Sequence, residues 1–249
     1  MIQKFPFYNF LRIPESEKPE FSDCCHECGN IPFPVCFGSD LTVSLVINNE
    51  YYNIETDCGI GYVTPDGQHI KCASNVIYKD YWTFAQLTDD LSQIFAPGDC
   101  FRLNINDSSG DYNHYSPLFI YIGCEEKDTV LFEYWDDVDE NKRFKIRLYA
   151  LIENPQSKTD KSEYESINGN VISLSKKRRK EYDLIFYFYP ENIHDSIKEM
   201  LMFPNILADE LPVFESGDYN IDHNNSNHNN CAKASTKISE QDIIRFKIC

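Results

Sequence analysis

The chain has 249 residues, 42% of them hydrophobic and 14% aromatic, and carries a formal net charge of −17. That length suffices for one large or two ordinary domains, and the hydrophobic content argues against general disorder. Since phosphate contacts supply much of the affinity for nucleic acids, so acidic a chain is not expected to bind nucleic acid specifically or to attach to an anionic membrane.

Residues 1–21 hold three prolines and scattered aromatics without helical or strand periodicity, so we expect an extended N-terminal arm. We expect no signal peptide and no membrane span, because no apolar run approaches about 20 residues. Synthesis in the reducing cytoplasm would leave the ten cysteines mostly as free thiols. The arm could wrap a neighbouring copy or pack on its own domain, and its interface candidates are Phe5, Phe7, Tyr8 and Phe10.

A cysteine-rich segment, Cys24 to Cys28, follows this arm. Its C-x-x-C spacing is typical of zinc ligands, but a tetrahedral site needs two more, and no second C-x-x-C exists. Further ligands could come from Cys36 or from a distant Asn/His-rich stretch; the alternatives are buried thiols, or a disulfide in an oxidising setting. The weak metal candidates are therefore Cys25, Cys28 and Cys36, and we expect neither bound zinc nor another cofactor.

Residues 22–153 predict a β-rich domain. Apolar residues alternate with polar ones, the period of a half-buried strand, in 41–47, 100–105, 117–124, 129–135 and 144–152. The segment 64–67, Thr-Pro-Asp-Gly, predicts a turn. One short helix is expected over 83–95, because Thr83 and Gln86 have capping-box spacing and apolar residues follow at helical spacing.

Two polar loops in this domain have alternative interpretations. Residues 136–143 are acidic, but they lack the glycine and the bidentate glutamate of a calcium-binding EF-hand loop, so a solvated hairpin tip is favoured. Asp107, Asp111 and His114 could form a hydrolytic group, but a plain turn between two strands is the simpler interpretation. The chain has no nucleophile elbow, P-loop or dinucleotide motif, so we expect no enzyme activity.

Residues 154–170 are polar and rich in turn formers, which predicts a linker or a long hairpin loop. A second β-rich domain or sheet layer is expected over 171–249. It begins with a strand and a basic run, Lys176 to Lys180. This run could be a solvated turn, could prevent aggregation of the following apolar strand, or could contact an acidic patch of a partner copy. Residues 182–190 predict a strand buried on both faces. The interface candidates in the basic run are Lys176, Arg178 and Arg179.

A second short helix is expected over 192–203, with Asn192 as N-cap and Pro204 as terminator. The simplest interpretation places His194 at the surface. The apolar stripe is wide for so short a helix, so we expect Met200 and Phe203 to leave apolar surface for a subunit contact. Later strands are expected at 211–214, 218–221, 232–238 and 243–249. Together these elements predict a mainly β, sandwich-type fold with two short helices.

Two segments resemble parts of virion tail proteins of crassvirus-like phages of gut Bacteroidales. In the first, over 91–105, Gly98, Cys100, Phe101 and Arg102 match a run that enters a core strand. In the second, over 171–201, a basic hairpin leads to a strand and then a His-bearing helix, matched here by Tyr182, Leu184, His194 and Ile197. The Asn/His-rich loop at 223–230 departs from this pattern.

The resemblance implies a non-enzymatic tail-hub or ring/adaptor subunit of a phage tail or neck, repeated around the DNA conduit within the virion. Its partners would be its own copies and other tail or neck proteins, and His194 would lie at a subunit contact. An acidic lumen suits DNA that must slide without sticking. The alternatives are a soluble β-sandwich that binds a ligand such as a glycan through exposed Tyr and Trp, and a metal-dependent enzyme centred on the cysteine cluster.

Overall fold

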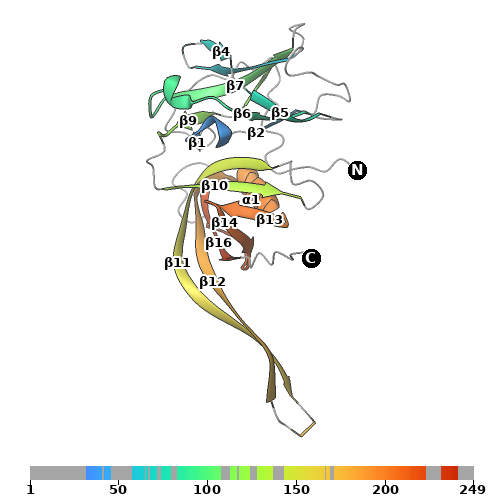
Figure 1. Ribbon diagram of the computed structural model, residues 1–249. Coiled ribbons are helices and arrows are strands. Elements are labelled where there is room, and N and C mark those ends of the chain that lie inside the picture. The colour runs from blue at the N-terminus through green and yellow to red at the C-terminus, as the bar shows by residue number, and fades with distance from the viewer. Residues whose placement is uncertain are drawn as a thin grey trace.

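The computed structural model describes residues 32–40, 42–45, 58–64, 66, 68–71, 74–79, 83–107, 113–116, 118–123, 128–136, 143–165, 167–168, 171–222 and 231–240. Within these residues the predicted mainly β, sandwich-type fold is confirmed. The described part holds one α-helix instead of the two expected. Figure 1 shows an upper group of strands, a lower group with the helix, and a long two-stranded ribbon that projects from the lower group.

The upper group contains two sheets. The larger has the order β1 (Phe33–Val35), β9 (Phe119–Tyr121), β7 (Cys100–Asp107), β3 (Cys58–Val63) and β4 (His69–Lys71), and β8 (Asn113–Tyr115) also pairs with β7. The smaller consists of β2 (Thr42–Leu45), β6 (Thr83–Leu87) and β5 (Ser74–Lys79). Two 3-10 turns, η3 (Gly38–Asp40) and η4 (Leu91–Gln93), complete this group. The predicted turn at 64–67 joins β3 to β4, where the Thr64 amide donates to the Gln68 carbonyl.

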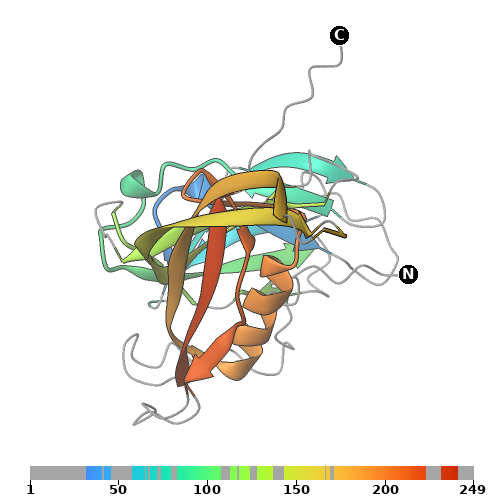
Figure 2. The ribbon, with the colours of Figure 1, turned by 90° about the horizontal axis from the view of Figure 1, so that it is seen from below.

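The lower group is one antiparallel sheet. Its order is β12 (Val171–Pro190), β11 (Phe144–Glu165), β10 (Thr129–Trp135), β13 (Asn205–Ala208), β14 (Leu211–Glu215), β16 (Cys231–Glu240) and β15 (Asn220–Asp222). Strands β12 and β16 also pair, so the sheet closes on itself. The helix α1 (Glu191–Leu201) follows β12 directly and lies beside these strands in Figure 2.

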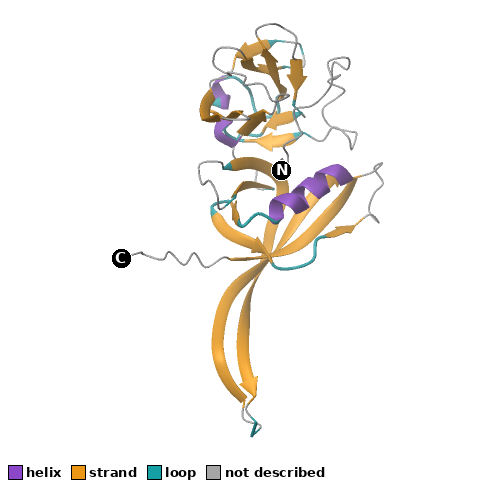
Figure 3. Ribbon diagram, turned by 90° about the vertical axis from the view of Figure 1, so that its right-hand side faces the viewer, coloured by secondary structure: helices purple, strands orange, loops and turns teal. Residues whose placement is uncertain are grey.

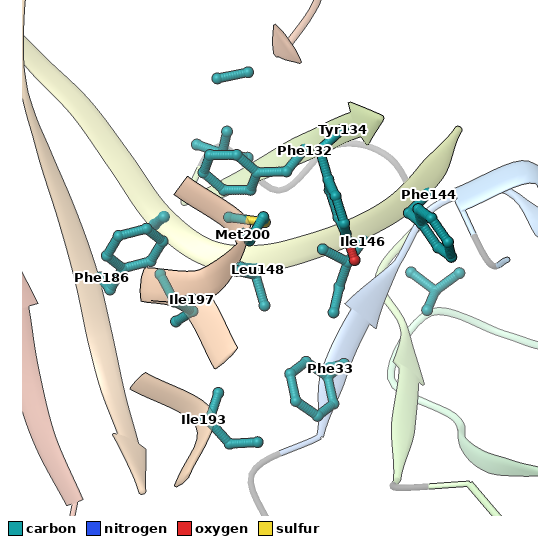
Figure 4. Close-up of a cluster of buried hydrophobic side chains, with 14 of the residues drawn as sticks. Phe33, Phe132, Tyr134, Phe144, Ile146, Leu148, Phe186, Ile193, Ile197 and Met200 are labelled. Carbon is teal, nitrogen blue, oxygen red and sulfur yellow. The ribbon is translucent and has the colours of Figure 1, made fainter. Parts of the chain in front are cut away.

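Buried aromatic and aliphatic side chains form one core that joins the two groups. Figure 4 shows Phe33 of β1 reaching toward Ile146 and Ile193, which belong to the lower group. Phe33 also stacks on Tyr189 of β12, with ring centroids 6.0 Å apart, and contacts Phe119 at 6.1 Å. Burial of aromatic side chains is a large favourable contribution to folding, so this shared core holds the upper strands on the lower sheet.

The prediction of a helix over residues 83–95 is wrong. Residues Thr83–Leu87 form strand β6, which is paired on both sides, with β2 and β5. Backbone pairing with two neighbours outweighs the weak local preference for a helix cap. The cap is Asp90, whose carboxylate accepts hydrogen bonds from the Ser92 amide at 3.1 Å and the Ser92 hydroxyl at 2.7 Å, and it starts only the single turn η4.

The helix predicted over residues 192–203 is confirmed, but it begins and ends at other residues than predicted. α1 spans Glu191–Leu201, so Asn192 lies inside the helix and does not precede it. One face of α1 is in the core, and it consists of Ile193, His194, Ile197, Met200 and Leu201. Residues 182–190 are not buried on both faces as expected: Leu184 and Phe186 are fully buried, whereas the alternate positions Ile185 and Tyr187 are only half-buried.

Of the two alternatives predicted over 154–170, a linker or a long hairpin loop, the structure has a hairpin, but most of that range is strand and not loop. Strand β11 continues to Glu165 and β12 begins at Val171, so only five residues connect them. The segment is a two-stranded antiparallel hairpin. β10 and β11, expected in the first domain, pair within the lower sheet with β12 and β13.

Candidate functional site

The distal parts of β11 and β12 form a hairpin that projects from the rest of the molecule. Strand β12 pairs with β16 only from Glu181 onward, so in the described chain residues 156–165 and 171–180 pair solely with each other. We call residues 156–180 the arm. Ten strand residues at about 3.3 Å each give it a length of roughly 30 Å. Figures 1 and 3 show it curving away from the body.

The arm leaves the body at a β-bulge. The register runs from Glu153↔Asp183 to Gln156↔Glu181, so two residues of β11 oppose one residue of β12. Asn154 has a φ of 51°, a left-handed conformation that asparagine tolerates better than most residues, and Pro155 follows it. The Asn154 side-chain amide donates to the Asp183 carboxylate at 2.9 Å. A bulge bends its strand and increases its twist, so these residues set the direction of the arm.

A buried carboxylate holds the base of the arm. Glu181 is 5% exposed, and its carboxylate accepts hydrogen bonds from Lys158 of β11 at 3.0 Å and Lys237 of β16 at 3.3 Å. The Ser216 hydroxyl also lies 3.4 Å away. The hydrogen bond from Lys158 lowers the pKa of Glu181, opposed by burial and assisted by Lys237. One side chain thus connects β11, β12 and β16 where the arm begins.

A second polar contact lies beside it. The Tyr182 hydroxyl donates to Glu240 at 2.6 Å, and Lys180 forms an ion pair with the same carboxylate at 3.4 Å. The hydrogen bond to Glu240, together with burial, raises the pKa of Tyr182 to about 12. The end of β16 is therefore fastened to β12 next to the base of the arm.

Replacement of Glu181 by Gln is expected to lower the free energy of unfolding by roughly 1–2 kcal/mol at neutral pH, a modest value because both lysines are 48% exposed. The folded-state pKa of Glu181 is lowered, so its contribution is complete above the unfolded value of 4.5 and is lost as the pH falls through the folded pKa. Denaturant unfolding at several pH values should show the wild type and Glu181→Gln converging in acid. A gap that stays constant down to the lowest pH would contradict this role.

The two faces of the arm differ in charge. The register places positions 161, 176, 178 and 180 on one face, and all four are Lys or Arg. The other face mixes signs, with Lys158, Asp160, Lys177 and Arg179. Arg178 and Lys180 are exposed, whereas Arg179 is half-buried, with its guanidinium carbon 5.4 Å from the Phe214 ring centroid. We call the first of these the basic face.

The tip of the arm carries an exposed apolar side chain. Ile167 is 100% exposed. Single exposed apolar side chains are common on protein surfaces, so Ile167 alone does not mark a contact site. The sequence around it, Ile167-Asn168-Gly169, contains the Asn-Gly pair favoured in two-stranded hairpins. That pair was the signal for the arm that the sequence analysis missed.

The structure removes two residues from the predicted interface, His194 and Met200, which are completely buried. Phe203 is half-buried, with its ring edge-on to Tyr134 at 5.1 Å, and its part in an interface stays a prediction. The surface position expected for His194 is also wrong. Its Nε2 donates to the Ala232 carbonyl at 2.9 Å, and its Nδ1 lies 2.7 Å from the Tyr219 hydroxyl. A carbonyl can only accept, so Nδ1 of the neutral ring accepts from Tyr219. His194 therefore fastens α1 to β16 and to Tyr219, just before β15.

The remaining predicted residues fall into three groups. Lys176, Arg178 and Arg179 lie on the arm, in a strand and not in the turn expected for the basic run. Cys36 and Cys231 are disulfide-bonded, so these two depart from the expected free thiols and Cys36 has no thiolate for a metal, whereas Cys100 is a buried thiol. Outside the described residues lie Phe5, Phe7, Tyr8, Phe10, Cys25 and Cys28.

In the part of the chain that the structure describes, the residues considered for metal binding or hydrolysis do not form a site. No group of three or more His, Cys, Asp or Glu side chains there could hold a metal ion. Asp111 and residues 137–142 lie outside the described residues; the strands that flank these two loops, β7 with β8 and β10 with β11, pair antiparallel. Among the described residues, no helix has the length and apolar character needed to cross a bilayer. No known protein family, curated protein or solved structure matches this chain.

Proposed function

We propose that this protein is a non-enzymatic structural subunit of a phage tail or neck, of the tail-hub or ring/adaptor type, which assembles with its own copies around the DNA conduit. The observation that carries the proposal is the arm. A two-stranded ribbon is marginally stable alone in water, and each outer edge presents unpaired backbone donors and acceptors. A ribbon of roughly 30 Å therefore suits a contact with a neighbouring subunit.

The charge and the cysteines support the same function. A chain with a net charge of −17 repels nucleic acid, so DNA would pass without sticking. Disulfides persist in oxidising settings, which include the surfaces of virions, and Cys36 and Cys231 are disulfide-bonded. The assignment to phage tails comes from the resemblance of residues 91–105 and 171–201 to crassvirus-like tail proteins.

The arm is expected to be necessary for assembly and dispensable for folding. Replacement of residues 160–177 by Asn-Gly would join Thr159 to Arg178 through a tight turn and would retain the Lys158–Glu181 ion pair. Native mass spectrometry and electron microscopy should find rings or stacks for the wild type and monomers for the shortened chain. Thermal unfolding should stay close to that of the wild type, because the removed residues lie outside the buried core.

A control for the tip is Ile167→Asn, which removes the exposed apolar side chain and leaves the ribbon intact. It should weaken assembly less than the shortened arm does. A wild-type chain that remains monomeric, or a shortened chain that assembles as the wild type does, would overturn the proposed role.

A further inference from the structure

We infer that the basic face of the arm docks, in a second copy of this chain, on the exposed acidic face of α1. This inference rests on the proposed function, because it names the two surfaces through which copies would meet. It depends on three properties of the described residues: the charges of the two surfaces, their spacing, and the direction of the arm.

The charge of the chain is divided unevenly. The arm, residues 156–180, contains seven Lys or Arg and three Asp or Glu, a net charge of +4. The whole chain carries −17, so the remainder carries −21. Along β12 the basic face presents Lys176, Arg178 and Lys180 at every second position. Opposite Lys176 the register places Lys161, so β11 adds a fourth basic position to this face.

The helix α1 offers such a surface. Its exposed positions include Glu191, Asp195 and Glu199, which are four residues apart and therefore lie on one side of the helix, opposite the buried residues Ile193 and Ile197. Like charges at this spacing repel each other along a helix. Asp195 pairs with Lys198 at 3.1 Å, but both side chains are largely exposed, and such pairs contribute little. The carboxylates thus remain available to a second chain.

The spacings of the two rows match. Four residues of helix rise about 6 Å, so the three carboxylates span about 12 Å. Two residues of strand advance about 6.7 Å, so Lys176, Arg178 and Lys180 span about 13 Å. Three basic side chains on the strand can therefore meet three carboxylates on the helix in register, since the long Lys and Arg side chains absorb the remaining difference of about 1 Å.

The direction of the arm indicates that the acidic row belongs to another copy. Figures 1 and 3 show the arm leaving the body and pointing away from α1 of its own chain. Lys180, at the base, pairs with Glu240 of its own chain at 3.4 Å, and its side chain is 61% exposed, so this weak pair can be exchanged on docking. Nucleic acid is the other ligand for a basic ribbon, but the −21 carried by the rest of the chain opposes it.

Charge reversal on each side tests the inference. The triple variant Lys176→Glu, Arg178→Glu, Lys180→Glu should weaken self-association on the order of 100-fold, and so should Glu191→Lys, Asp195→Lys, Glu199→Lys. An equimolar mixture of the two variants should associate again, because opposite charges then face each other in half of the contacts. Sedimentation velocity measures all three, with circular dichroism to confirm folding. Wild-type association should weaken as salt increases, since exposed charge pairs are screened.

A matched control reverses three exposed carboxylates elsewhere on the body, Asp128→Lys, Glu210→Lys and Asp218→Lys, and should leave association unchanged. A wild type that associates while both triple variants associate equally well would overturn this inference and leave the proposed function standing. A wild type that does not associate would overturn both. Binding of a short labelled DNA duplex by the wild type, lost in the arm variant while association persists, would assign the basic face to nucleic acid instead.

Discussion

Replacement of Met200 by Asp is expected to unfold the protein. Met200 is 0% exposed, and Figure 4 shows it among Phe132, Leu148 and Ile197. The change removes apolar contacts in the core and places a carboxylate where no water can solvate it. The combined cost is about 4–5 kcal/mol or more, against a total stability of about 5–15 kcal/mol for an ordinary domain.

Thermal unfolding followed by circular dichroism measures the effect. Met202→Asp is the matched control, because Met202 lies two residues further along the chain, is 79% exposed, and should change stability by about 0.5 kcal/mol or less. Met200→Leu, which nearly conserves volume, should cost less than about 1.5 kcal/mol. If Met200→Asp remained folded and affected only association, the packing of α1 described above would be incorrect. That result would restore Met200 as an interface residue.

The strands of the body could be predicted because each has one face in the core. Residues 129–135 alternate apolar and polar side chains, and they form β10 with the same bounds. The arm escaped prediction for the opposite reason: it lies outside the core, so its sequence lacks an apolar period, and only its Asn-Gly turn indicated a hairpin. Its pairing joins residues up to 23 positions apart, such as Ser157 with Lys180, which a local pattern does not encode.

The candidate site could be predicted only in part. Contact with a partner copy was one of three interpretations of the basic run, and it stays a prediction; the run lies in a strand and not in a turn. The acidic row of α1 could not be singled out from the sequence, because charged residues occupy the exposed face of any amphipathic helix. The wide stripe, with Met200 and His194, is internal because the closed sheet accommodates the whole of it.

Loss of Arg147 is expected to destabilise the protein strongly, because it breaks the polar contact between the upper and lower strands. Arg147 lies on β11, on the face opposite its core residues, and that face is covered by η3. Its Nε donates to the Asp40 carboxylate at 2.9 Å, and Asp40 is 2% exposed. The same carboxylate accepts from the backbone amides of Cys36 at 3.0 Å and Phe37 at 3.3 Å.

Arg147→Met would leave the Asp40 charge buried, with the Cys36 and Phe37 amides as its donors among the described residues. Breaking a buried pair by removing one partner costs about 3–5 kcal/mol, because the other charge loses its compensation. Denaturant unfolding should report a loss of this size. Lys145→Met is the matched control on the same face, since Lys145 pairs with Glu133 at 3.1 Å and both side chains are partly exposed, so its loss should cost about 1 kcal/mol or less.

The double variant Asp40→Asn, Arg147→Met separates the contribution of the Asp40–Arg147 ion pair from the cost of leaving the Asp40 charge buried. Asparagine keeps an oxygen for the amides of Cys36 and Phe37 and removes the buried charge, so the double variant should recover much of the stability that Arg147→Met loses. The coupling energy from this cycle should be about 1–3 kcal/mol, as for other residues in direct contact. Additive effects of the two changes would mean that Asp40 and Arg147 stabilise the fold independently, and the ion pair would then not be what joins the two groups of strands.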